Sequence, residues 1–316
     1  MMEIAPQFGL AIIALLFEAL VGYPDRIQRW LPHPVVWAGS LIAALERRLN
    51  RPSLSPFGRR CLGVVTLLIV SASAASAGYG AQRLCGRSIA GIAIAAILAS
   101  TGLGQKSLHR HVAAVASALD RGSLAEARSS VGRIVGRDVG ALGPSEIAAA
   151  GLESLAESFN DGIVAPAFWL VLAGLPGIFA YKAVNTADSM IGHREERWRD
   201  FGWMAARTDD AMNLLPARLA GALIALAGGG GWRIMARDAS KHASPNAGWP
   251  EAAMAGALKV RLGGPATYDG VVAERAQLGE GREPMPADLA HGLGVYVRAC
   301  ALLWAIVAIG ALAWPR

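Results

Sequence analysis

The stretch CLGVVTLLIVSASAASAGYG, residues 61–80, decides the class of fold to which this chain belongs. It contains no charged residue and matches the roughly 17 to 25 residues that a helix needs to cross a bilayer. Residues 5–23, 88–104 and 299–314 are similar in length and apolar character. Buried helices of a soluble protein are the alternative, but so many apolar runs in one weakly charged chain favour membrane spans. The sequence therefore predicts a polytopic integral membrane protein.

Composition supports a lipid environment and excludes other classes. Of 316 residues, 53% are hydrophobic and 17% are charged, against about 25% charged residues in soluble domains. The net charge of +6 does not predict nucleic-acid binding, because the basic residues flank apolar runs and form no aromatic-studded stripe. The cysteines, Cys61, Cys85 and Cys300, are odd in number and lack metal-type spacing, which predicts neither a disulfide framework nor a zinc site.

Two further apolar runs are irregular and predict re-entrant helices. Residues 163–180 contain Pro166, Gly174, Pro176 and Gly177, and residues 219–231 are short and end in GGGG. Broken helices at membrane depth are tolerated where they pack in protein or line a cavity. We expect one all-α membrane domain over residues 1–316, with amphipathic and re-entrant helices and polar cytoplasmic loops.

The basic residues predict the orientation. The loop between the first two spans is rich in arginine and poor in acids, which places it in the cytoplasm. Residues 105–295 share that side if both irregular runs re-enter, so we expect a multi-pass protein of the cell (inner) membrane with a cytoplasmic site. Arg83 and Arg87 fall on the outer side and oppose this scheme. The arginines that support it are Arg26, Arg29, Arg47, Arg48, Arg51, Arg59 and Arg60.

The first polar cluster is ESLAESFNDG, residues 153–162. Glu153, Glu157 and Asp161 recur every fourth residue, so a helix here places three carboxylates on one face. Like charges at this spacing destabilise a helix by a few tenths of a kcal/mol per pair. The pattern therefore indicates a cationic partner.

The second cluster is YKAVNTADSMIGHREERWRDFGWMAARTDDAMNLLPAR, residues 181–218. Lys182, Asn185 and Asp188 share a helical face, and Asp209 and Asp210 follow with nearby arginines. Carboxylate and amide oxygens suit Mg²⁺, and basic side chains suit phosphates. The competing interpretation, local ion pairs in a solvated segment, is preferred for Glu195, Glu196, Arg197 and Arg199.

The third cluster is RDASKHASPNAGWPEAAMAGALKVRLGG, residues 237–264. SPNAGWP is typical of a turn, and Trp249 can lie at the membrane interface or stack on a flat ligand. Lys241 and other basic residues surround it, and a structural role is preferred for His242. The chain has no GxxxxGK[ST], HExxH or GxSxG motif and no GxGxxG after a strand, so nucleotide chemistry must use another kind of site.

Several of these runs, in order, resemble the CobD/CbiB family of cobalamin-biosynthesis membrane proteins, the adenosylcobinamide-phosphate synthases. They are LPHPVVWAGSLIAALERRLN, IVGRD, ESLAESFNDGIVAPAFW, YKAVNTADSMIGHREERWRDFG, DDAMNLLPARL and SPNAGWPEAAMAGALKVRLGGP. The chain departs from the family pattern at Ser158, where Asn is usual, and at Tyr23, where GDP often stands in place of GYP.

The resemblance implies a ligase that forms a carbon–nitrogen bond at the expense of ATP. Such an enzyme joins adenosylcobyric acid to (R)-1-amino-2-propanol O-2-phosphate, or ethanolamine phosphate, and releases adenosylcobinamide phosphate. The cofactors expected are ATP and Mg²⁺. The partners expected are the corrinoid, the amino-alcohol phosphate and the lipid bilayer, with a second copy or other cobalamin-pathway membrane enzymes as further partners and no nucleic acid.

Roles follow as hypotheses from the clusters and the resemblance together. The predicted Mg²⁺ ligands or bases are Glu153, Glu157, Asp161, Asn185, Asp188, Asp209 and Asp210. The predicted phosphate ligands are Lys182, Arg194, Arg207, Arg218 and Lys241, and the predicted corrin contacts are Asn246 and Trp249. The catalytic group is predicted to comprise Glu153, Glu157, Asp161, Lys182 and Asp188. These pieces are expected to fold into one inward-facing pocket.

Two other functions remain open at this point. A membrane signalling or accessory protein related to β-lactamase induction is the first, and in it the acidic clusters would be vestigial. A membrane transporter with broken helices is the second. The absence of inverted hydropathy repeats and the position of the charges outside the apolar runs count against a transporter.

Overall fold

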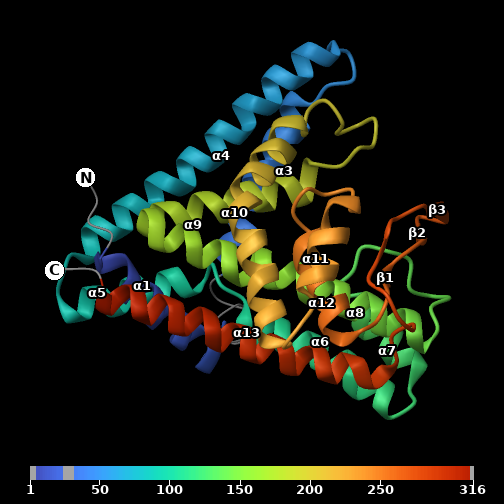
Figure 1. The fold of residues 1–316 in the computed structure, drawn as a ribbon. Coiled ribbons are helices and arrows are strands. Elements are labelled where there is room, and N and C mark those ends of the chain that lie inside the picture. The colour runs from blue at the N-terminus through green and yellow to red at the C-terminus, as the bar shows by residue number, and fades with distance from the viewer. Residues whose placement is uncertain (1–4, 24–31, 314–316) are drawn as a thin grey trace. The chain divides into compact units, whose positions relative to one another are not determined.

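A computed structural model describes residues 5–23 and 32–313 of the chain (Figure 1). The Arg26 and Arg29 contributions to the predicted orientation lie outside the described residues. The chain forms two compact units, which we describe separately. The first unit comprises Met1–Gly104, Ala165–Asn213 and Val307–Arg316, and the second comprises Gln105–Val164 and Leu214–Ile306.

Helices make up almost all of the regular structure. The first unit holds α1 (Ala5–Leu20), α3 (Pro34–Leu49), α4 (Pro56–Cys85), α5 (Ile89–Ser100) and α9 (Ala165–Ile191). The second holds α6 (Gln105–Asp120), α7 (Leu124–Val131), α8 (Pro144–Phe159), the π-helix η1 (Asn160–Val164), α11 (Trp232–Asp238), the 3₁₀ turn η2 (Ala239–Lys241) and α12 (Gly248–Leu258). The unit boundary falls within α10 (Trp203–Ala227) and α13 (Pro286–Ala313).

Sheet is confined to two short antiparallel pairs in the second unit. β1 (Leu262–Gly263) pairs with β4 (Gln277–Leu278), and β2 (Ala266–Tyr268) pairs with β3 (Val271–Ala273). These strands were not expected from the sequence, because each is too short to show alternation of apolar and polar residues. The all-α class is nonetheless correct.

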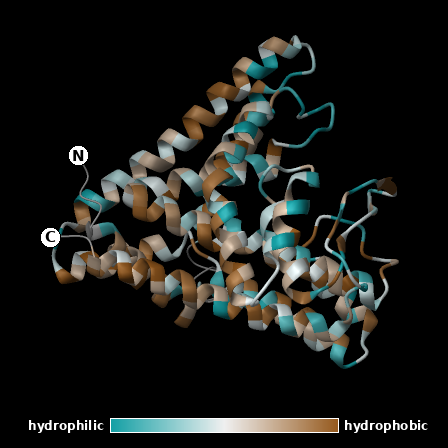
Figure 2. Ribbon diagram, in the orientation of Figure 1, coloured by the Kyte–Doolittle hydropathy of each residue, from teal (hydrophilic) through white to brown (hydrophobic). Residues whose placement is uncertain are grey.

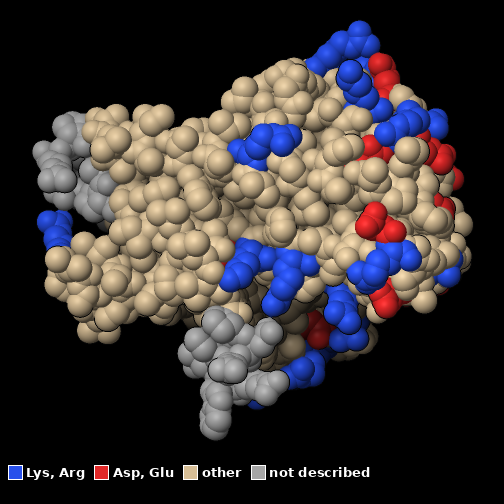
Figure 3. Space-filling model, turned by 90° about the horizontal axis from the view of Figure 1, so that it is seen from below, with Lys and Arg blue, Asp and Glu red and all other residues tan. Residues whose placement is uncertain are grey.

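Within residues 5–23 and 32–313, five helical runs are long and apolar enough to cross a membrane, judged by length and composition. Figure 2 shows hydrophobic residues along α4 and α13, and hydrophilic residues on the loop that follows α9. The face drawn in Figure 3 has large areas without charged side chains. The runs are Pro56–Cys85, Ile89–Asp120, Pro144–Ile191, Trp203–Ala227 and Pro286–Ala313. They agree with a polytopic protein.

Some runs differ in extent from the sequence expectation. The first predicted span corresponds to α1, which has 16 residues and is shorter than the roughly 17 to 25 residues of a span. Residues 219–231 belong mostly to α10, which already begins at Trp203. α10 is longer than its apolar part because buried polar residues, among them Asp209 and Asn213, continue the helix in its first half.

α9 contains the interruption that its glycines and prolines indicate. Gly174 has φ 65° and ψ −153°, a backbone conformation that only glycine adopts readily. The side chain of Gln82 in α4 lies at this break. Its Oε1 accepts a hydrogen bond of 2.8 Å from the Leu175 backbone N–H. A glutamine from another helix thus satisfies a backbone group that the broken helix leaves without its usual partner.

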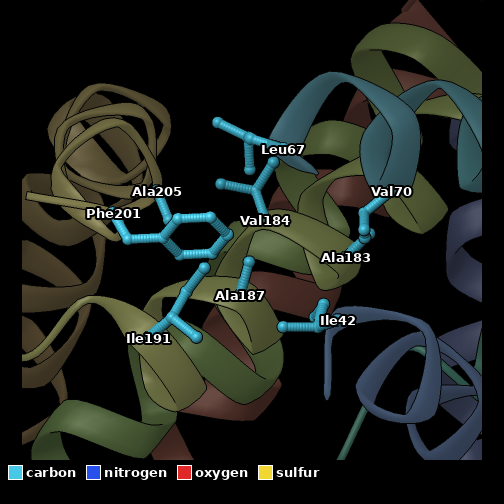
Figure 4. Close-up of a cluster of buried hydrophobic side chains, with 9 residues drawn as sticks. All are labelled: Ile42, Leu67, Val70, Ala183, Val184, Ala187, Ile191, Phe201 and Ala205. Carbon is cyan, nitrogen blue, oxygen red and sulfur yellow. The ribbon is translucent and has the colours of Figure 1, made fainter. Parts of the chain in front are cut away.

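The core of the first unit lies where α3, α4 and α9 pack against the start of α10. Figure 4 shows the apolar side chains of these elements directed toward one another. Close approach of the backbones is possible because Gly63 has no side chain, and a Cβ there would lie on the Phe201 carbonyl oxygen. The side chains drawn are Ile42, Leu67, Val70, Ala183, Val184, Ala187, Ile191, Phe201 and Ala205. This core fixes α9 beside α10, from which the polar site described next is built.

Candidate functional site

A continuous chain of hydrogen bonds joins α9 to α10 in the first unit. Lys182 Nζ donates to Asn185 Oδ1 at 3.2 Å, and Asn185 Nδ2 donates to Asp209 Oδ1 at 3.2 Å. The other carboxylate oxygen, Asp209 Oδ2, accepts from Asn213 Nδ2 at 3.0 Å. Asn213 Oδ1 in turn accepts from the Tyr181 hydroxyl at 3.0 Å. We call these five residues the α9–α10 polar chain.

The polar chain lies in two runs that are long enough to span a membrane, and three of its five residues are buried. Tyr181 is 0% exposed, Asn213 2% and Asp209 9%. Polar and ionisable groups placed inside membrane segments are rare and usually functional. The two amides donate to the two oxygens of Asp209, so both asparagines are held in one orientation and the carboxylate is fixed between the helices. The sequence had predicted Lys182, Asn185 and Asp209 as site residues, and the structure brings them together.

Tyr181 and Asn213 were not among the predicted site residues. Asn213 lies four residues after Asp209, and Tyr181 precedes Lys182 by one residue, so Tyr181 belongs to a different face of α9 by sequence spacing alone. The signal that could have identified them is their position in apolar helices, because a buried amide and a buried hydroxyl both need partners. A tyrosine in an apolar run is too common for that signal to be specific.

His33 adds a third element to this part of the first unit. It caps α3, and its Nδ1 accepts a hydrogen bond of 3.3 Å from the Val35 backbone N–H. Burial lowers the pKa of His33, the positive charge of Lys182 lowers it further, and a hydrogen bond to the Thr101 backbone opposes the shift. The run LPHPVV therefore places an imidazole near Lys182, and the positive charge of Lys182 favours the neutral form of that ring.

The remaining predicted residues of the first unit lie around the end of α9. Asp188 Oδ1 lies against Gly192, where a Cβ would be 1.9 Å from it. Asp210 on α10 is half-buried, and the charges of Arg194 and Arg207 act on it. Both arginines are exposed. Asp210, Arg194 and Arg207 therefore form a group of mixed charge.

Glu153 of the second unit has the cationic partners that its spacing indicates, and they are two arginines. It is 3% exposed, and its Oε1 accepts from the Gly263 backbone N–H at 2.8 Å. Its Oε2 accepts from Arg275 at 3.1 Å and also from Arg137. Glu153 thus holds the loop before α8 and strand β1 to α8. A metal ion at Glu153 would have to displace these partners.

The other two acids of the first cluster are placed differently. Glu157 is exposed, and Asp161 lies in the π-helix η1, where its Oδ1 accepts from Asn160 Nδ2 at 2.7 Å. A π-helix widens the turn and frequently marks a functional site. Because η1 begins at Asn160, the regular fourth-residue spacing of the cluster does not continue to Asp161 as it would in an uninterrupted α-helix.

Buried Glu251 on α12 is the main acid that the sequence reasoning missed. It is 1% exposed, with Oε1 3.7 Å from His242 Nε2 and Oε2 3.9 Å from Arg275. Oε2 has no hydrogen-bond donor among the described residues. Burial raises the pKa of Glu251 well above its ordinary value, and the charges of Glu153 and Glu157 raise it further. A single acid in the apolar run WPEAAMAG was the available signal.

His242 has a structural environment, as the sequence analysis preferred. Its Nδ1 accepts from the Ser244 backbone N–H at 3.0 Å, so the neutral ring carries its proton on Nε2, toward Glu251. Burial lowers the pKa of His242, and the Ser244 carbonyl oxygen, 3.4 Å from Nδ1, has a smaller opposing effect. A neutral His242 in this tautomer orients groups and does not accept a proton at Nε2.

Arg218, Asn246 and Trp249 come together in the second unit. The Arg218 guanidinium lies 4.6 Å from the centroid of the Trp249 ring, which is a cation–π contact. Arg218 Nη1 donates to the Leu214 carbonyl at 2.6 Å and to Asn246 Oδ1 at 3.4 Å. The three residues predicted for phosphate and corrin binding therefore form one contact group between α10 and the start of α12.

Lys241 has a strong local partner. Its Nζ lies 2.6 Å from Asp238 Oδ1, and Asp238 is 0% exposed. Asp238 also accepts from Arg237 and from the Gly279 backbone N–H at 2.9 Å. The hydrogen bond from Arg237 is the largest cause of the lowered pKa of Asp238. Lys241 therefore belongs to an ion-pair group that attaches η2 to strand β4.

Within the described residues, no group of three or more His, Cys, Asp or Glu side chains is arranged to hold a metal ion. The Mg²⁺ ligand set predicted from the sequence thus does not form such a group. Asn185 and Asp209 fit Mg²⁺ in the type of donor, because this ion is bound through one or two carboxylates together with neutral oxygens and water. A metal role for the other predicted acids stays a prediction.

Comparison with known proteins adds what geometry does not provide. A family model described as CobD/Cbib protein matches residues 11–296. This chain belongs to the CobD/CbiB family. One relative, from Rhodobacter capsulatus, is named "Cobalamin biosynthesis protein CobD". It is 47% identical to this chain over 310 residues, which cover 97% of this chain and 98% of the relative. No solved structure is significantly similar to the chain.

Other CobD relatives are similar over comparable lengths. One from a Sinorhizobium species is 44% identical over 303 residues, covering 92% of this chain and 94% of the relative. One from Geobacter metallireducens is 43% identical over 293 residues, covering 90% of each. The CobD/CbiB match includes the α9–α10 polar chain, the Glu153 group and the Arg218–Trp249 contact.

Proposed function

We propose that this protein acts in cobalamin biosynthesis as an adenosylcobinamide-phosphate synthase. It joins the free carboxyl group of adenosylcobyric acid to the amine of (R)-1-amino-2-propanol O-2-phosphate, or of ethanolamine phosphate. Membership of the CobD/CbiB family over residues 11–296 is the observation that carries the pathway assignment. The polar chain between α9 and α10 supports an enzyme, because it fixes a carboxylate, two amides and a lysine inside apolar helices.

The reaction explains why a charged site is needed. A carboxylate is a poor electrophile, so it must be phosphorylated before an amine can replace the phosphate and form the amide. ATP supplies the phosphoryl group, and Mg²⁺ offsets the charge that spreads over the phosphate oxygens. The amine enters as an ammonium ion and must lose protons to react, which requires a base held near it.

The first unit offers residues for the phosphate and metal part of this chemistry. Asp209 and Asn185 would hold Mg²⁺ through their oxygens, with Lys182 beside them as a fixed positive charge. Arg194 and Arg207 would bind phosphates, and Asp188 or Asp210 would act as ligand or base. Tyr181 and Asn213 keep Asp209 in place.

The second unit offers residues for recognition of the corrin. Trp249 presents a flat aromatic surface, and Asn246 lies in the same contact group. Arg218, stacked on Trp249, would bind a phosphate or a carboxylate at the edge of the ring system. Lys241 contributes a further positive charge, and Glu157 and Asp161 are the acids of this unit for metal binding or proton transfer. Glu153 is proposed mainly to hold Arg137 and Arg275.

The experiment that tests the proposal is a reconstitution with purified protein in lipid vesicles. Protein is given ATP, Mg²⁺, adenosylcobyric acid and aminopropanol phosphate, and the products are identified by mass spectrometry. We expect adenosylcobinamide phosphate, with ATP consumed only when both substrates are present. Solute flux across the vesicles without ligation would instead support a transporter, and neither flux nor ligation would support an accessory protein. The proposed location is the inner membrane, with the site toward the cytoplasm.

A further inference from the structure

Three exposed arginines, at the end of α3 and in the turn after it, form no ion pair with the other residues that the structure describes. Arg47 and Arg48 end α3, and Arg51 follows in the turn. Among the ion pairs of the described residues, none involves any of the three. Within the part of the chain that the structure describes, the one side-chain hydrogen bond of this group runs from Arg51 Nε to the Arg48 carbonyl, at 3.1 Å. We call Arg47, Arg48 and Arg51 the basic turn.

The acids nearest in the fold are already engaged by other arginines. Glu46 is buried and accepts two hydrogen bonds of 3.0 Å from Arg197. Asp200 is also buried and pairs with Arg60 at 2.9 Å. Glu195 and Glu196 are exposed on the loop after α9 and form no ion pair with the basic turn. The described acids of the first unit therefore leave the positive charge of the basic turn without an ion-pair partner.

The basic turn is held rigidly. The Asn50 backbone N–H donates to the Glu46 carbonyl at 2.9 Å, and Asn50 Nδ2 donates to the Arg197 carbonyl at 2.9 Å. Arg59 donates to the Glu196 carbonyl at 2.8 Å. These bonds attach the turn to the loop that follows α9. A fixed turn loses little conformational entropy when it binds a ligand.

The surroundings of the basic turn match the edge of a bilayer. The apolar run of α4 begins directly after Arg60. Phe57 is 77% exposed and Trp203 is 42% exposed, and the Arg60 guanidinium lies 5.9 Å from the Trp203 ring centroid. Aromatic residues gather at the level of lipid headgroups, and basic residues beside them bind anionic lipids. We propose that the basic turn, with Phe57 and Trp203, is a binding site for anionic phospholipid headgroups.

The occupant is a lipid and not a soluble phosphate, because exposed aromatic and apolar surface adjoins the arginines. Each basic residue near an anionic leaflet changes affinity about fivefold. Replacing both Arg47 and Arg48 by Gln should therefore weaken binding of phosphatidylglycerol roughly tenfold to thirtyfold at low ionic strength. Phosphatidylcholine, which has no net charge, should bind equally to the variant and the wild type.

The test measures lipid binding to the full-length protein by native mass spectrometry, with phosphatidylglycerol or phosphatidylcholine added. The variant is Arg47→Gln/Arg48→Gln. Its matched control is Arg83→Gln/Arg87→Gln, which removes the same charge at the other end of α4. We expect the first variant alone to lose preference for phosphatidylglycerol. Wild-type binding should fall with added salt, and inorganic phosphate should lower it no more than sodium chloride at the same ionic strength.

Three outcomes would overturn the proposal. An equal loss of the preference for phosphatidylglycerol in both double variants would show that lipid is attracted by the general positive charge of the protein. Unchanged preference in Arg47→Gln/Arg48→Gln would remove these arginines from lipid binding. Stronger displacement of lipid by inorganic phosphate than by sodium chloride at the same ionic strength would indicate a soluble anion as the occupant. If the variant is unstable, Arg47→Lys/Arg48→Lys keeps the charge and should retain the preference. All of these readouts are independent of amide synthesis, so they stand even if the proposed function fails.

Discussion

Tyr181 illustrates how a single hydroxyl can control a carboxylate through a neighbouring amide. It donates to Asn213 Oδ1 at 3.0 Å, and Asn213 Nδ2 donates to Asp209 Oδ2 at 3.0 Å. The hydroxyl fixes which way the Asn213 amide points, because only the oxygen can accept from it. The amide nitrogen is thereby directed at Asp209.

Removing this hydroxyl gives the first prediction. Tyr181→Phe should lower the free energy of unfolding by about 1 kcal/mol, the usual contribution of one hydrogen bond. The rate of amide formation should fall even where the protein remains folded, because Asn213 can then rotate away from Asp209. The measurements are thermal unfolding and the rate of amide formation. Tyr79→Phe, at a residue that is 55% exposed, is the control and should change neither. Full turnover in Tyr181→Phe would show that the hydroxyl has no part in positioning.

Glu251 gives a prediction on pH. Its pKa is raised by burial and then by the charges of Glu153 and Glu157, against smaller opposite effects of Arg275 and Arg137; His242 also faces it. Between the ordinary and the raised pKa, the unfolded chain has released a proton that the folded chain retains. Stability should therefore fall as pH rises through this window, by at most about 1.4 kcal/mol per pH unit from this group.

The variant Glu251→Gln has no proton to release and should lose this part of the pH dependence. We expect its melting temperature, relative to the wild type, to increase as pH is raised from mildly acidic to mildly alkaline values. Glu283→Gln, whose parent carboxylate is 72% exposed, is the control. A constant difference between Glu251→Gln and the wild type over this range would mean that Glu251 is ionised throughout.

At the scale of elements, the break in α9 is the feature most open to test. Gly174 has φ 65°, and a Cβ there would lie 2.3 Å from Gln82 Oε1. Gly174→Ala should destabilise the first unit by about 1 to 3 kcal/mol, because only glycine adopts this conformation without strain. Gly80→Ala in α4, where a Cβ meets nothing within 4 Å, is the matched control. Thermal unfolding in one detergent compares the two variants, and equal stability would show that α9 has no break at Gly174.

The sequence predicted elements well where a local pattern decides them. Ile191 ends α9 directly before Gly192, Pro144 opens α8, and the apolar run 61–80 lies within α4. It failed where a distant residue decides the outcome. The predicted run 219–231 left out the first half of α10, where Asp209 and Asn213 are buried because α9 supplies their partners.

The candidate site, like the helices, was predictable where local spacing decides it and not where distant residues do. Helical spacing predicted that Lys182 and Asn185 share a face, and the tendency of acids near apolar runs to be functional singled out Asp209. Spacing did not predict that Glu153 is held by Arg137 and Arg275, because those partners are distant in sequence. Nor did it single out Glu251, whose burial depends on segments before α8 and after β3.

For the molecule as a whole, family membership and the polar chain between α9 and α10 lead to the same expectation for Asp209. If the chain is an amide-forming enzyme of cobalamin biosynthesis, then the carboxylate at the centre of that chain must matter for the chemistry and not only for the fold. Asp209→Asn tests this, because it removes the charge with little change of shape. Asp120→Asn, at an exposed position at the end of α6, is the matched control.

The most direct measurement is the rate at which purified Asp209→Asn protein forms adenosylcobinamide phosphate in vesicles. Circular dichroism first establishes that the variant is folded. We predict that the wild type and Asp120→Asn form product, and that Asp209→Asn forms it at least about a hundredfold more slowly. Product formation by Asp209→Asn at the wild-type rate would contradict the account of the site, and no product from the wild type would contradict the proposed function.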